Sequence, residues 1–329
     1  MAEKSISEIV DLASAYYGSA VLFAALDVGV FAAVEKSGKL ADIASYCQSS
    51  VRGMRLLLDA CVAEGLLGKN GDEYFNTPSS RMALVPGGKA DLTRAIRYNR
   101  DVYPAWGKLK EFVLSGNPVE KPEIHLGEDT ERTKDFAASM FSRAFGIGRG
   151  VVPMMELKGR VLDLAGGPGA YAILMAKANE NISVVTMDLP AISGEAEKYV
   201  EQHGLKSRIE CRKGDYHVDE YEESSYDVVT IFGALHQESP NDIVDILKRA
   251  HKALKKGGKI YILDMMTDAT HCNPTFSALF AVNMALTTEN GWVFSYDELS
   301  SYLSEAGFSG FSVTNVPPPM PHALASAIA

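Results

Sequence analysis

Five short runs rich in apolar and β-branched residues constrain the fold of this 329-residue chain more than any other feature. They follow one another in the C-terminal half, with helical stretches between most of them, at 160–164, 182–187, 208–211, 226–231 and 259–263. This alternation is typical of a parallel sheet covered by helices on both faces. Two further runs, 311–316 and 323–328, flank Pro317-Pro318-Pro319 and predict an antiparallel hairpin at one edge. The predicted fold class is therefore α/β, with a mostly parallel seven-stranded doubly wound sheet.

The N-terminal half has helical periodicity instead. Residues 6–34 predict two amphipathic helices interrupted at Gly18 and Gly29, residues 40–46 a short helix, and 51–64 a helix that ends at Gly65. Two short strands around Asn70-Gly71 follow, and helices followed by a small hairpin are the order of a winged helix. Further helices are predicted at 98–114 and 135–145, joined by a polar segment at 116–122. We predict three regions: a mainly helical winged-helix domain over 1–95, a helical connector over 96–150, and the sheet domain over 151–329.

The composition is that of an ordinary globular protein, with 47% hydrophobic and 22% charged residues. No run of about 18 uncharged apolar residues suggests a membrane span, and the N-terminus does not read as a secretory signal, so we expect a cytoplasmic protein. The four cysteines lack the short paired spacing of a disulfide framework or a metal site. A net charge of −10 disfavours nucleic acid as a partner, and the basic residues at 248–256 are interpreted as a solvated helix face.

The turn after the first run of the sheet domain, Asp163 to Gly169, is the candidate cofactor site. Its glycines allow close backbone approach, and the helix from Ala170 directs N-terminal amides toward a ligand. The sixth position of a dinucleotide fingerprint is Ala172, which leaves that pattern imperfect. Asp163 would repel a pyrophosphate but suits an ammonium group, which favours S-adenosylmethionine over a dinucleotide.

Two more acids follow later strands. Asp188 ends the second predicted strand, where it can accept hydrogen bonds from ribose hydroxyls, and Asp215 follows the third, where an adenine amino group would lie. Each acid alone could simply cap the next helix. The three together with the glycine turn favour a cofactor site.

Motifs along nearly the whole chain carry a resemblance. They include Leu26-Asp27-Val28-Gly29-Val30-Phe31, Gly65-Leu66-Leu67, Trp106-Gly107, Asp163 to Gly169, Asp188-Leu189-Pro190, Gly214-Asp215, Leu235-His236, Gly257-Gly258 and Glu305-Ala306-Gly307-Phe308. With these the chain resembles the small-molecule O-methyltransferases of the caffeic acid and hydroxyindole group. Their bacterial members combine a winged-helix dimerisation domain with a Rossmann-like methyltransferase domain, so the resemblance implies a homodimer that uses S-adenosyl-L-methionine, releases S-adenosyl-L-homocysteine and needs no metal.

The resemblance also implies cofactor contacts. Asp163, Gly167 and Gly169 would line the methionine moiety, Asp188 and Leu189 the ribose, and Asp215 and Tyr216 the adenine, with Phe232 near the ring. One departure is Ala165, where these enzymes usually have glycine.

Methyl transfer to a phenol requires removal of a proton, and a histidine, with an ordinary pKa of about 6.5, is a suitable general base. His236 follows the fourth predicted strand, and it matches the base of these O-methyltransferases. Asp264, at the end of the fifth, matches the acid that orients that base. The plant enzymes have Asp-Trp after the histidine, where this chain has Gln237-Glu238. They also have a second acid where this chain has Val293, and Glu289 is a candidate substitute.

By resemblance, the acceptor pocket is formed by two helical segments; its residues would be Phe136, Met140, Arg143, Asn283, Met284 and Thr288. Their helical spacing also suits a hydrophobic core, and the sequence does not separate the two interpretations. Phenols, polyketides, hydroxyindoles and hydroxybenzimidazoles all suit such a pocket.

Three alternatives stay open. The same fold could carry out N- or C-methylation, or bind the cofactor without methyl transfer. A winged helix could bind DNA, although the candidate recognition segment offers only Arg52 and Arg55. An NAD-dependent dehydrogenase is disfavoured by Asp163.

Overall fold

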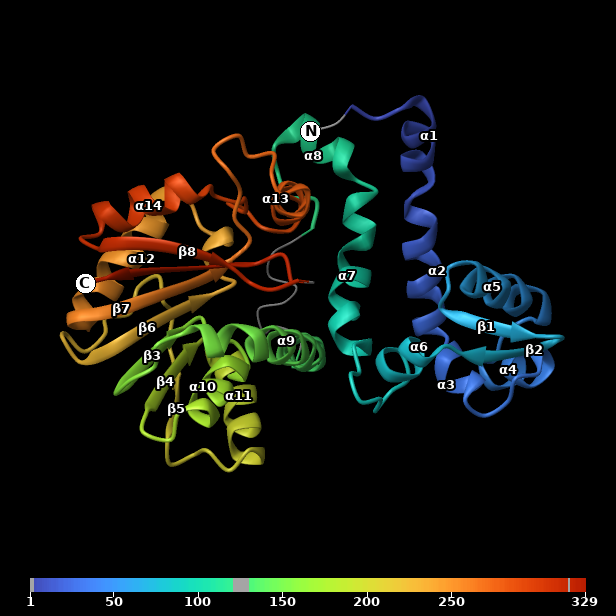
Figure 1. Cartoon of the computed structure of the whole chain (residues 1–329), viewed down its shortest axis with the longest axis horizontal. Helices are drawn as coiled ribbons and strands as arrows, with labels where there is room; N and C mark the ends of the chain where they lie inside the picture. Colours follow the sequence, from blue (N-terminus) through green and yellow to red (C-terminus); the bar gives the residue numbers. More distant parts are fainter. Residues whose placement is uncertain (1–2, 121–129, 319) are drawn as a thin grey trace. The chain divides into compact units, whose positions relative to one another are not determined.

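The chain divides into two compact units, Met1–Arg100 and Asp101–Ala329, each of which is described by itself (Figure 1). The computed structural model describes residues 3–120, 130–318 and 320–329. Part of the polar segment predicted at 116–122 therefore lies outside the described residues. The boundary between the units falls within one helix, α7.

The N-terminal unit consists of short helices and one hairpin. Its elements are α1 (Ile6–Ser14), α2 (Tyr16–Asp27), α3 (Val30–Val34), α4 (Leu40–Tyr46), α5 (Val51–Ala63), β1 (Leu67–Asn70), β2 (Glu73–Asn76), α6 (Pro78–Ala83) and the start of α7 (Thr93–Trp106). The prediction of two helices over 6–34 is wrong, because three are present. The first break falls at Ala15, whereas Gly18 lies inside α2, where its backbone approaches the Glu64 carboxylate. Gly29 adopts a left-handed φ of +78°, which ends α2 and begins α3.

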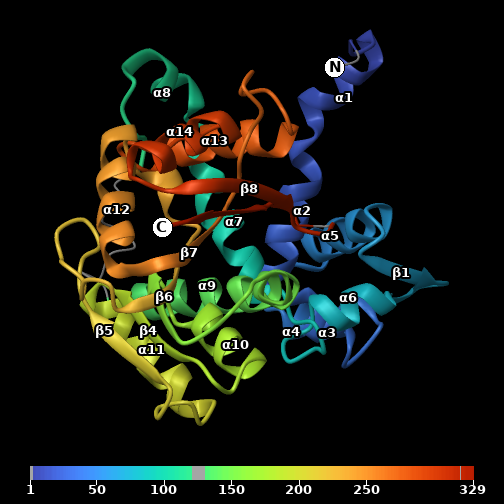
Figure 2. The same ribbon diagram turned by 60° about the vertical axis from the view of Figure 1, so that its left-hand side comes forward.

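The hairpin and the helices around it agree with the prediction. Asn70 pairs with Glu73, so Gly71 and Asp72 form a two-residue loop, and Gly71 supplies the positive φ that such a loop requires. The core of the unit contains one face of α5, with Met54, Leu58 and Cys61 buried. Figure 2 shows the hairpin extending beside α5.

The run Ile6–Asp27, which spans α1 and α2, is the most apolar helical stretch of the N-terminal unit, although it contains the charged residues Glu8 and Asp11. It is 22 residues long and reaches a mean hydropathy of 1.6 over an 18-residue window, which is long and apolar enough to cross a membrane by length and composition alone. Its side chains are mostly uncovered within the described chain, and Ile6 is 83% exposed. An apolar helical surface of this kind calls for a covering partner.

The C-terminal unit contains the predicted sheet. Its helices are α8 (Leu109–Ser115), α9 (Thr130–Val151), α10 (Ala170–Ala178), α11 (Pro190–Gln202), α12 (Pro240–Ala253), α13 (Thr275–Thr287) and α14 (Tyr296–Glu305). Its strands are β3 (Arg160–Leu164), β4 (Ser183–Asp188), β5 (Ile209–Lys213), β6 (Tyr226–Phe232), β7 (Leu254–Asp264), β8 (Ser309–Asn315) and β9 (Ala323–Ile328). The strand order is β5-β4-β3-β6-β7-β9-β8, and β9 is antiparallel to both of its neighbours. The predicted seven-stranded sheet with an antiparallel C-terminal hairpin is thus confirmed.

Helices cover both faces of this sheet. In Figures 1 and 2, α9, α10 and α11 lie on one side, and α12 and α14 lie on the other. Two separate cores result, one with Val161, Val184 and Val228 facing α9 to α11, and one with Leu162, Val229 and Ile260 facing α12 and α14. Because residues of the central strands alternate between two buried faces, these strands are mostly apolar, as the sequence indicates, whereas the edge strands β5 and β8 are largely polar or exposed.

Three helix predictions need correction. The helix predicted at 98–114 is interrupted at Gly107 and forms α7 and α8, and α9 is longer than the predicted 135–145. Lys255 and Lys256 belong to the start of β7, so only the basic residues up to Lys252 lie on a helix.

Candidate active site

The candidate site lies at the carboxyl edge of the sheet, where the strand order reverses between the neighbouring strands β3 and β6. The glycine turn follows β3, and the loop with His236 follows β6. Ligands of open α/β sheets bind at such a switch point. The topology therefore brings together two segments that are about 70 residues apart in the sequence.

Asp163, at the end of β3, is completely buried. Its carboxylate accepts hydrogen bonds from the hydroxyls of Thr230, at 2.7 Å, and Thr186, at 3.1 Å. Burial raises the pKa of Asp163 to about 6, and the two threonine hydrogen bonds only partly offset this effect. A cation beside the turn would favour the charged carboxylate, which fits the ammonium group of the expected cofactor.

The backbone of the turn packs tightly against this acid. A Cβ on Gly166 would lie 1.9 Å from the Thr186 hydroxyl oxygen and 2.6 Å from a carboxylate oxygen of Asp163, so no larger residue fits there. Gly167 has nothing within 4 Å of an added Cβ, and its φ is +57°. Ala165 also has a left-handed φ, of +51°, which strains a residue that carries a side chain.

The two later acids hold loop backbones in place. Asp188 accepts hydrogen bonds from the amides of Gly167 and Leu189, both at 2.8 Å, and burial raises its pKa. Asp215 lies two residues beyond β5 and accepts from the amide of His217 at 2.9 Å. Burial alone would raise the pKa of Asp215, but the contacts with His217 hold it below its ordinary value.

His236 and Asp264 form a buried pair. His236 lies in the short 3-10 helix Leu235–Gln237, Asp264 ends β7, and the His236 Nδ1 to Asp264 Oδ1 distance is 2.6 Å. They are 7% and 1% exposed. The Phe280 ring on α13 packs edge-on against the imidazole, with the ring centroids 5.1 Å apart. A histidine held by a carboxylate beside an aromatic ring is equipped to act as a general base.

His322 is a buried residue at this edge of the sheet that the sequence analysis did not assign to the site. It precedes β9, whose first residue pairs with Asp264, and its Nδ1 has no hydrogen-bond partner in the described chain. Burial, assisted by the positive charge of Arg143, lowers the pKa of His322 to about 4. No sequence signal marks this isolated histidine, because only the antiparallel hairpin brings it beside β7.

The predicted substrate residues lie on α9 and at α13. Phe136, Met140 and Arg143 on α9 are half-buried, whereas Asn283 and Met284 on α13 are buried. The amide oxygen of Asn283 accepts from the Trp106 indole at 2.9 Å. Thr288, just beyond α13, donates to the Met284 carbonyl at 2.8 Å.

The candidate second acid does not join the histidine pair. Glu289 is exposed, and no hydrogen bond or ion pair is described for it, whereas Val293 is buried. The imidazole Nδ1 of His236 is already engaged by Asp264. The structure therefore gives Glu289 no catalytic contact.

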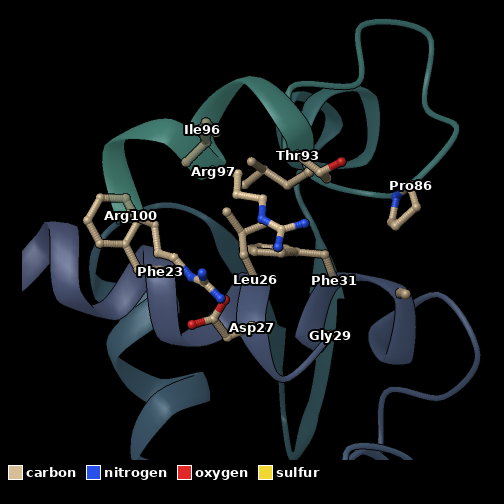
Figure 3. A pocket seen from close by; sticks show the side chains of 12 residues that line it. Phe23, Leu26, Asp27, Gly29, Phe31, Pro86, Thr93, Ile96, Arg97 and Arg100 are labelled. Atoms are coloured by element: carbon tan, nitrogen blue, oxygen red, sulfur yellow. The ribbon is translucent and has the colours of Figure 1, made fainter. Parts of the chain in front are cut away.

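The N-terminal unit contains a pocket of about 310 Å³, which is shown in Figure 3. Its walls combine apolar side chains such as Phe23 and Leu26 with Arg97 and Arg100. Arg100 faces Asp27 in this view and forms an ion pair with it at 2.8 Å. None of the lining residues belongs to the candidate active site.

Comparisons with known proteins agree with this description. The O-methyltransferase domain family matches residues 122–309, and the O-methyltransferase dimerisation domain family matches residues 10–86. The chain is 28% identical to 3-hydroxy-5-methyl-1-naphthoate 3-O-methyltransferase of Streptomyces sahachiroi, over 92% of this chain and 89% of that protein. It is 27% identical to L-tyrosine C(3)-methyltransferase of Streptomyces lavendulae, over 79% of this chain and 69% of that protein.

The fold has solved counterparts as well. The structure of human N-acetylserotonin methyltransferase in complex with S-adenosylmethionine superimposes with a TM-score of 0.87, at 24% identity, over 99% of this chain and 98% of that one. The O-methyltransferase domain match alone covers more than half of the chain. Together with the sheet order and the glycine turn, these matches show that the chain belongs to the S-adenosylmethionine-dependent O-methyltransferase family.

Proposed function

We propose that this O-methyltransferase methylates a hydroxyl group on a small aromatic or heteroaromatic acceptor, with His236 as the general base. The observation that carries the proposal is the buried His236–Asp264 pair at 2.6 Å, beside the Phe280 ring and at the switch point of the sheet. The naphthoate O-methyltransferase among the relatives supports an aromatic acceptor.

The geometry assigns a role to each member of the pair. Because His236 Nδ1 donates to Asp264, the other ring nitrogen, Nε2, carries the lone pair that accepts a proton. S-adenosylmethionine supplies a methyl group on a sulfonium, whose departing thioether needs no proton. A phenol with a pKa of about 10 is mostly neutral near pH 7, so its deprotonation is the step that this chain must assist. Asp264 stabilises the imidazolium that results and holds the ring in orientation; its Oδ1 also accepts the Met265 amide at 2.8 Å.

We assign the cofactor contacts to the strand-end residues as the sequence predicts them. Asp163, with Gly167 and Gly169, would hold the methionine end, where the negative charge of Asp163 would attract the ammonium group; each Asp163 oxygen accepts one threonine hydrogen bond and keeps a further acceptor site. Asp188 and Leu189 would hold the ribose. Asp215, Tyr216 and Phe232 would surround the adenine.

The acceptor site is proposed to lie between α9 and α13 at this edge of the sheet. Phe280 and Met284 on α13, with Met140 on α9, supply flat or adaptable apolar surfaces suited to an aromatic ring. Phe280 was not among the sequence predictions, and its contact with the His236 ring is what assigns it here.

We further propose that two copies of the chain associate through the N-terminal unit, as a winged-helix dimerisation domain. The dimerisation family match and the exposed apolar side chains of α1 and α2, including Ile9, Val10 and Leu12, support this proposal. Light scattering after gel filtration tests it. Ile9→Glu together with Leu12→Glu is expected to halve the mass, and an unchanged mass would contradict the assignment.

The base role is tested with His236→Asn. This variant is expected to lose methyl transfer by about 10²- to 10⁴-fold while it still binds S-adenosylhomocysteine. Glu289→Gln is the matched control, because that exposed acid has no contact with the pair, and it should keep full activity. Wild-type activity in His236→Asn would rule out the base.

C-methylation is a second candidate, because the tyrosine C(3)-methyltransferase matches at 27% identity. Fragmentation of the methylated product in a mass spectrometer distinguishes the two outcomes. A methyl on oxygen supports the proposal, and a methyl on a ring carbon supports the alternative.

A further inference from the structure

Glu238 stands two residues after the base, at a position where the resembling plant enzymes have tryptophan. It is a carboxylate that is only 6% exposed. A buried carboxylate requires hydrogen-bond donors, and Glu238 has two of them on consecutive residues. The Tyr216 hydroxyl donates to Oε1 at 2.6 Å, and His217 Nε2 lies 2.9 Å from Oε2.

These contacts form a closed network around the proposed adenine site. The other nitrogen of His217, Nδ1, lies 2.7 Å from Asp215 Oδ1, so the imidazole bridges two carboxylates. A ring that donates from both nitrogens is an imidazolium. Burial alone would lower the pKa of His217, but the two carboxylates raise it above its ordinary value. The rings of Tyr216 and His217 also stack, with centroids 4.3 Å apart.

Trp292 holds the backbone of the same glutamate. The indole Nε1 of Trp292 donates to the Glu238 carbonyl at 2.9 Å, and its backbone amide donates to the His236 carbonyl at 2.9 Å. Arg249 donates to the His217 carbonyl, and the charged α12 residues Asp242, Asp245 and Lys248 line the same pocket as His217. The segment from His236 to Glu238 is therefore tied to the loop after β5 by side chains and to Trp292 by its backbone.

We propose that Glu238 is a positioning residue, which fixes Tyr216 and His217 at the adenine site and joins that site to the loop that carries the base His236. The proposal rests on the placement of adenine beside Asp215 and Tyr216. A tryptophan side chain at position 238, as in the plant enzymes that this chain resembles, could not accept these two hydrogen bonds. The cofactor site and the base are thereby coupled through one carboxylate.

The test is calorimetric titration of the full chain with S-adenosylhomocysteine at pH 6, 7 and 8. Glu238→Gln removes the negative charge with little change of shape, and Glu238→Ala removes both acceptors. We expect the dissociation constant of Glu238→Ala to rise about tenfold, as is typical when buried donors lose their partner. In Glu238→Gln, His217 has one carboxylate partner fewer and should lose its proton at a lower pH. The loss of affinity that accompanies this deprotonation, as the pH is raised, should therefore also begin at a lower pH. NMR titration of the His217 Cε1 proton should show the same downward shift without any ligand.

Glu222→Gln is the matched control. Glu222 also accepts hydrogen bonds from a tyrosine hydroxyl, that of Tyr226, and from a cation, Arg212, but it lies outside the site. The Glu222→Gln variant should have the wild-type dissociation constant for S-adenosylhomocysteine and the wild-type titration of His217. If Glu238→Gln lowers only the melting temperature and leaves both readouts as in the wild type, the positioning role is wrong.

Two further outcomes are decisive. If Glu238→Ala does not fold, Tyr216→Phe replaces it in the titration, because this variant removes only the hydroxyl that donates to Glu238. Unchanged affinity in both Tyr216→Phe and Glu238→Gln would overturn the proposal. Failure of the wild type to bind S-adenosylhomocysteine would overturn the cofactor placement itself. The NMR shift of His217, which needs no ligand, separates that failure from a failure of the glutamate network.

Discussion

The affinity for S-adenosylhomocysteine should depend on pH through Asp163. The pKa of this buried acid is about 6, so the carboxyl is mostly ionised at pH 7 and mostly protonated at pH 5. The ligand carries an α-ammonium group, and a cation within about 4–6 Å lowers a carboxyl pKa by about 1 to 3. Binding should therefore release a proton at low pH.

The magnitude follows from these values. If bound ligand lowers the pKa of Asp163 from about 6 to about 4.5, the dissociation constant at pH 5 is about eight times that at pH 7. Asp163→Asn keeps a polar group of the same size between Thr186 and Thr230 but does not ionise. Its affinity should be lower than that of the wild type at pH 7 and nearly independent of pH between 5 and 7.

The assay is isothermal titration calorimetry at pH 5, 6 and 7, in two buffers of different ionisation enthalpy so that proton release is measured directly. Glu222→Gln is the matched control, because it removes a carboxylate outside the site, where Arg212 and Tyr226 are its partners. It should keep a wild-type slope with pH. A wild-type dissociation constant that changes less than twofold from pH 7 to pH 5, or a slope that survives in Asp163→Asn, would refute the electrostatic argument.

Three further predictions concern stability and the base. The pKa of His322 is about 4 in the folded chain and about 6.5 in the unfolded chain, so only the unfolded state takes up a proton between these pH values. The free energy of unfolding should therefore fall by up to roughly 3 kcal/mol as the pH drops through this range. Urea unfolding at pH 7 and pH 4.5 should show a smaller loss in His322→Asn than in the wild type, and an equal loss would contradict the assignment. Ala165→Gly should stabilise the C-terminal unit by about 0.5–1 kcal/mol, because relief of the left-handed φ outweighs the added freedom of the unfolded chain; an unchanged melting temperature would count against strain at this position. Asp264→Asn should lower kcat by at least about 100-fold with little effect on the KM for S-adenosylmethionine, and a KM effect alone would assign Asp264 to binding.

The sheet domain was predictable because its signal is local and strong. Each strand buried on both faces is a largely apolar run; Asp188 and Asp264 end β4 and β7, and Asp163 is the penultimate residue of β3, close to where the sequence places them. A residue at the end of a parallel strand reaches the same sheet edge whatever the connecting loops do. That rule brings His236 and Asp264 to one edge without knowledge of any side-chain contact, and the structure adds the hydrogen bond between them.

The predictions that needed correction depended on tertiary packing. Gly18 lies within α2, where the Glu64 carboxylate packs 3.1 Å from the position of an added Cβ, so this glycine does not mark the helix break, which falls at Ala15. Lys255 and Lys256 continue a helical spacing past the end of α12, but the chain has already entered β7.

The missed residues have the same origin. Each missed residue reaches the site through a partner that is distant in the sequence. His322 lies next to Ala323, which pairs with Asp264 on β7. Phe280 contacts the His236 ring, and Glu238 accepts from the Tyr216 hydroxyl. No periodicity or spacing rule encodes such pairs.

Methyl transfer to an aromatic hydroxyl, assisted by His236, can be observed with an isotope label. The most direct measurement incubates the wild type and His236→Asn with S-adenosylmethionine that carries a deuterated methyl group, together with a panel of phenols, hydroxynaphthoates and hydroxyindoles, and locates the label by mass spectrometry. We predict a label on oxygen with the wild type, and a loss of at least about 100-fold in His236→Asn with S-adenosylhomocysteine binding retained. A label on carbon or nitrogen, or equal rates for the two proteins, would overturn the proposed O-methylation with His236 as the base.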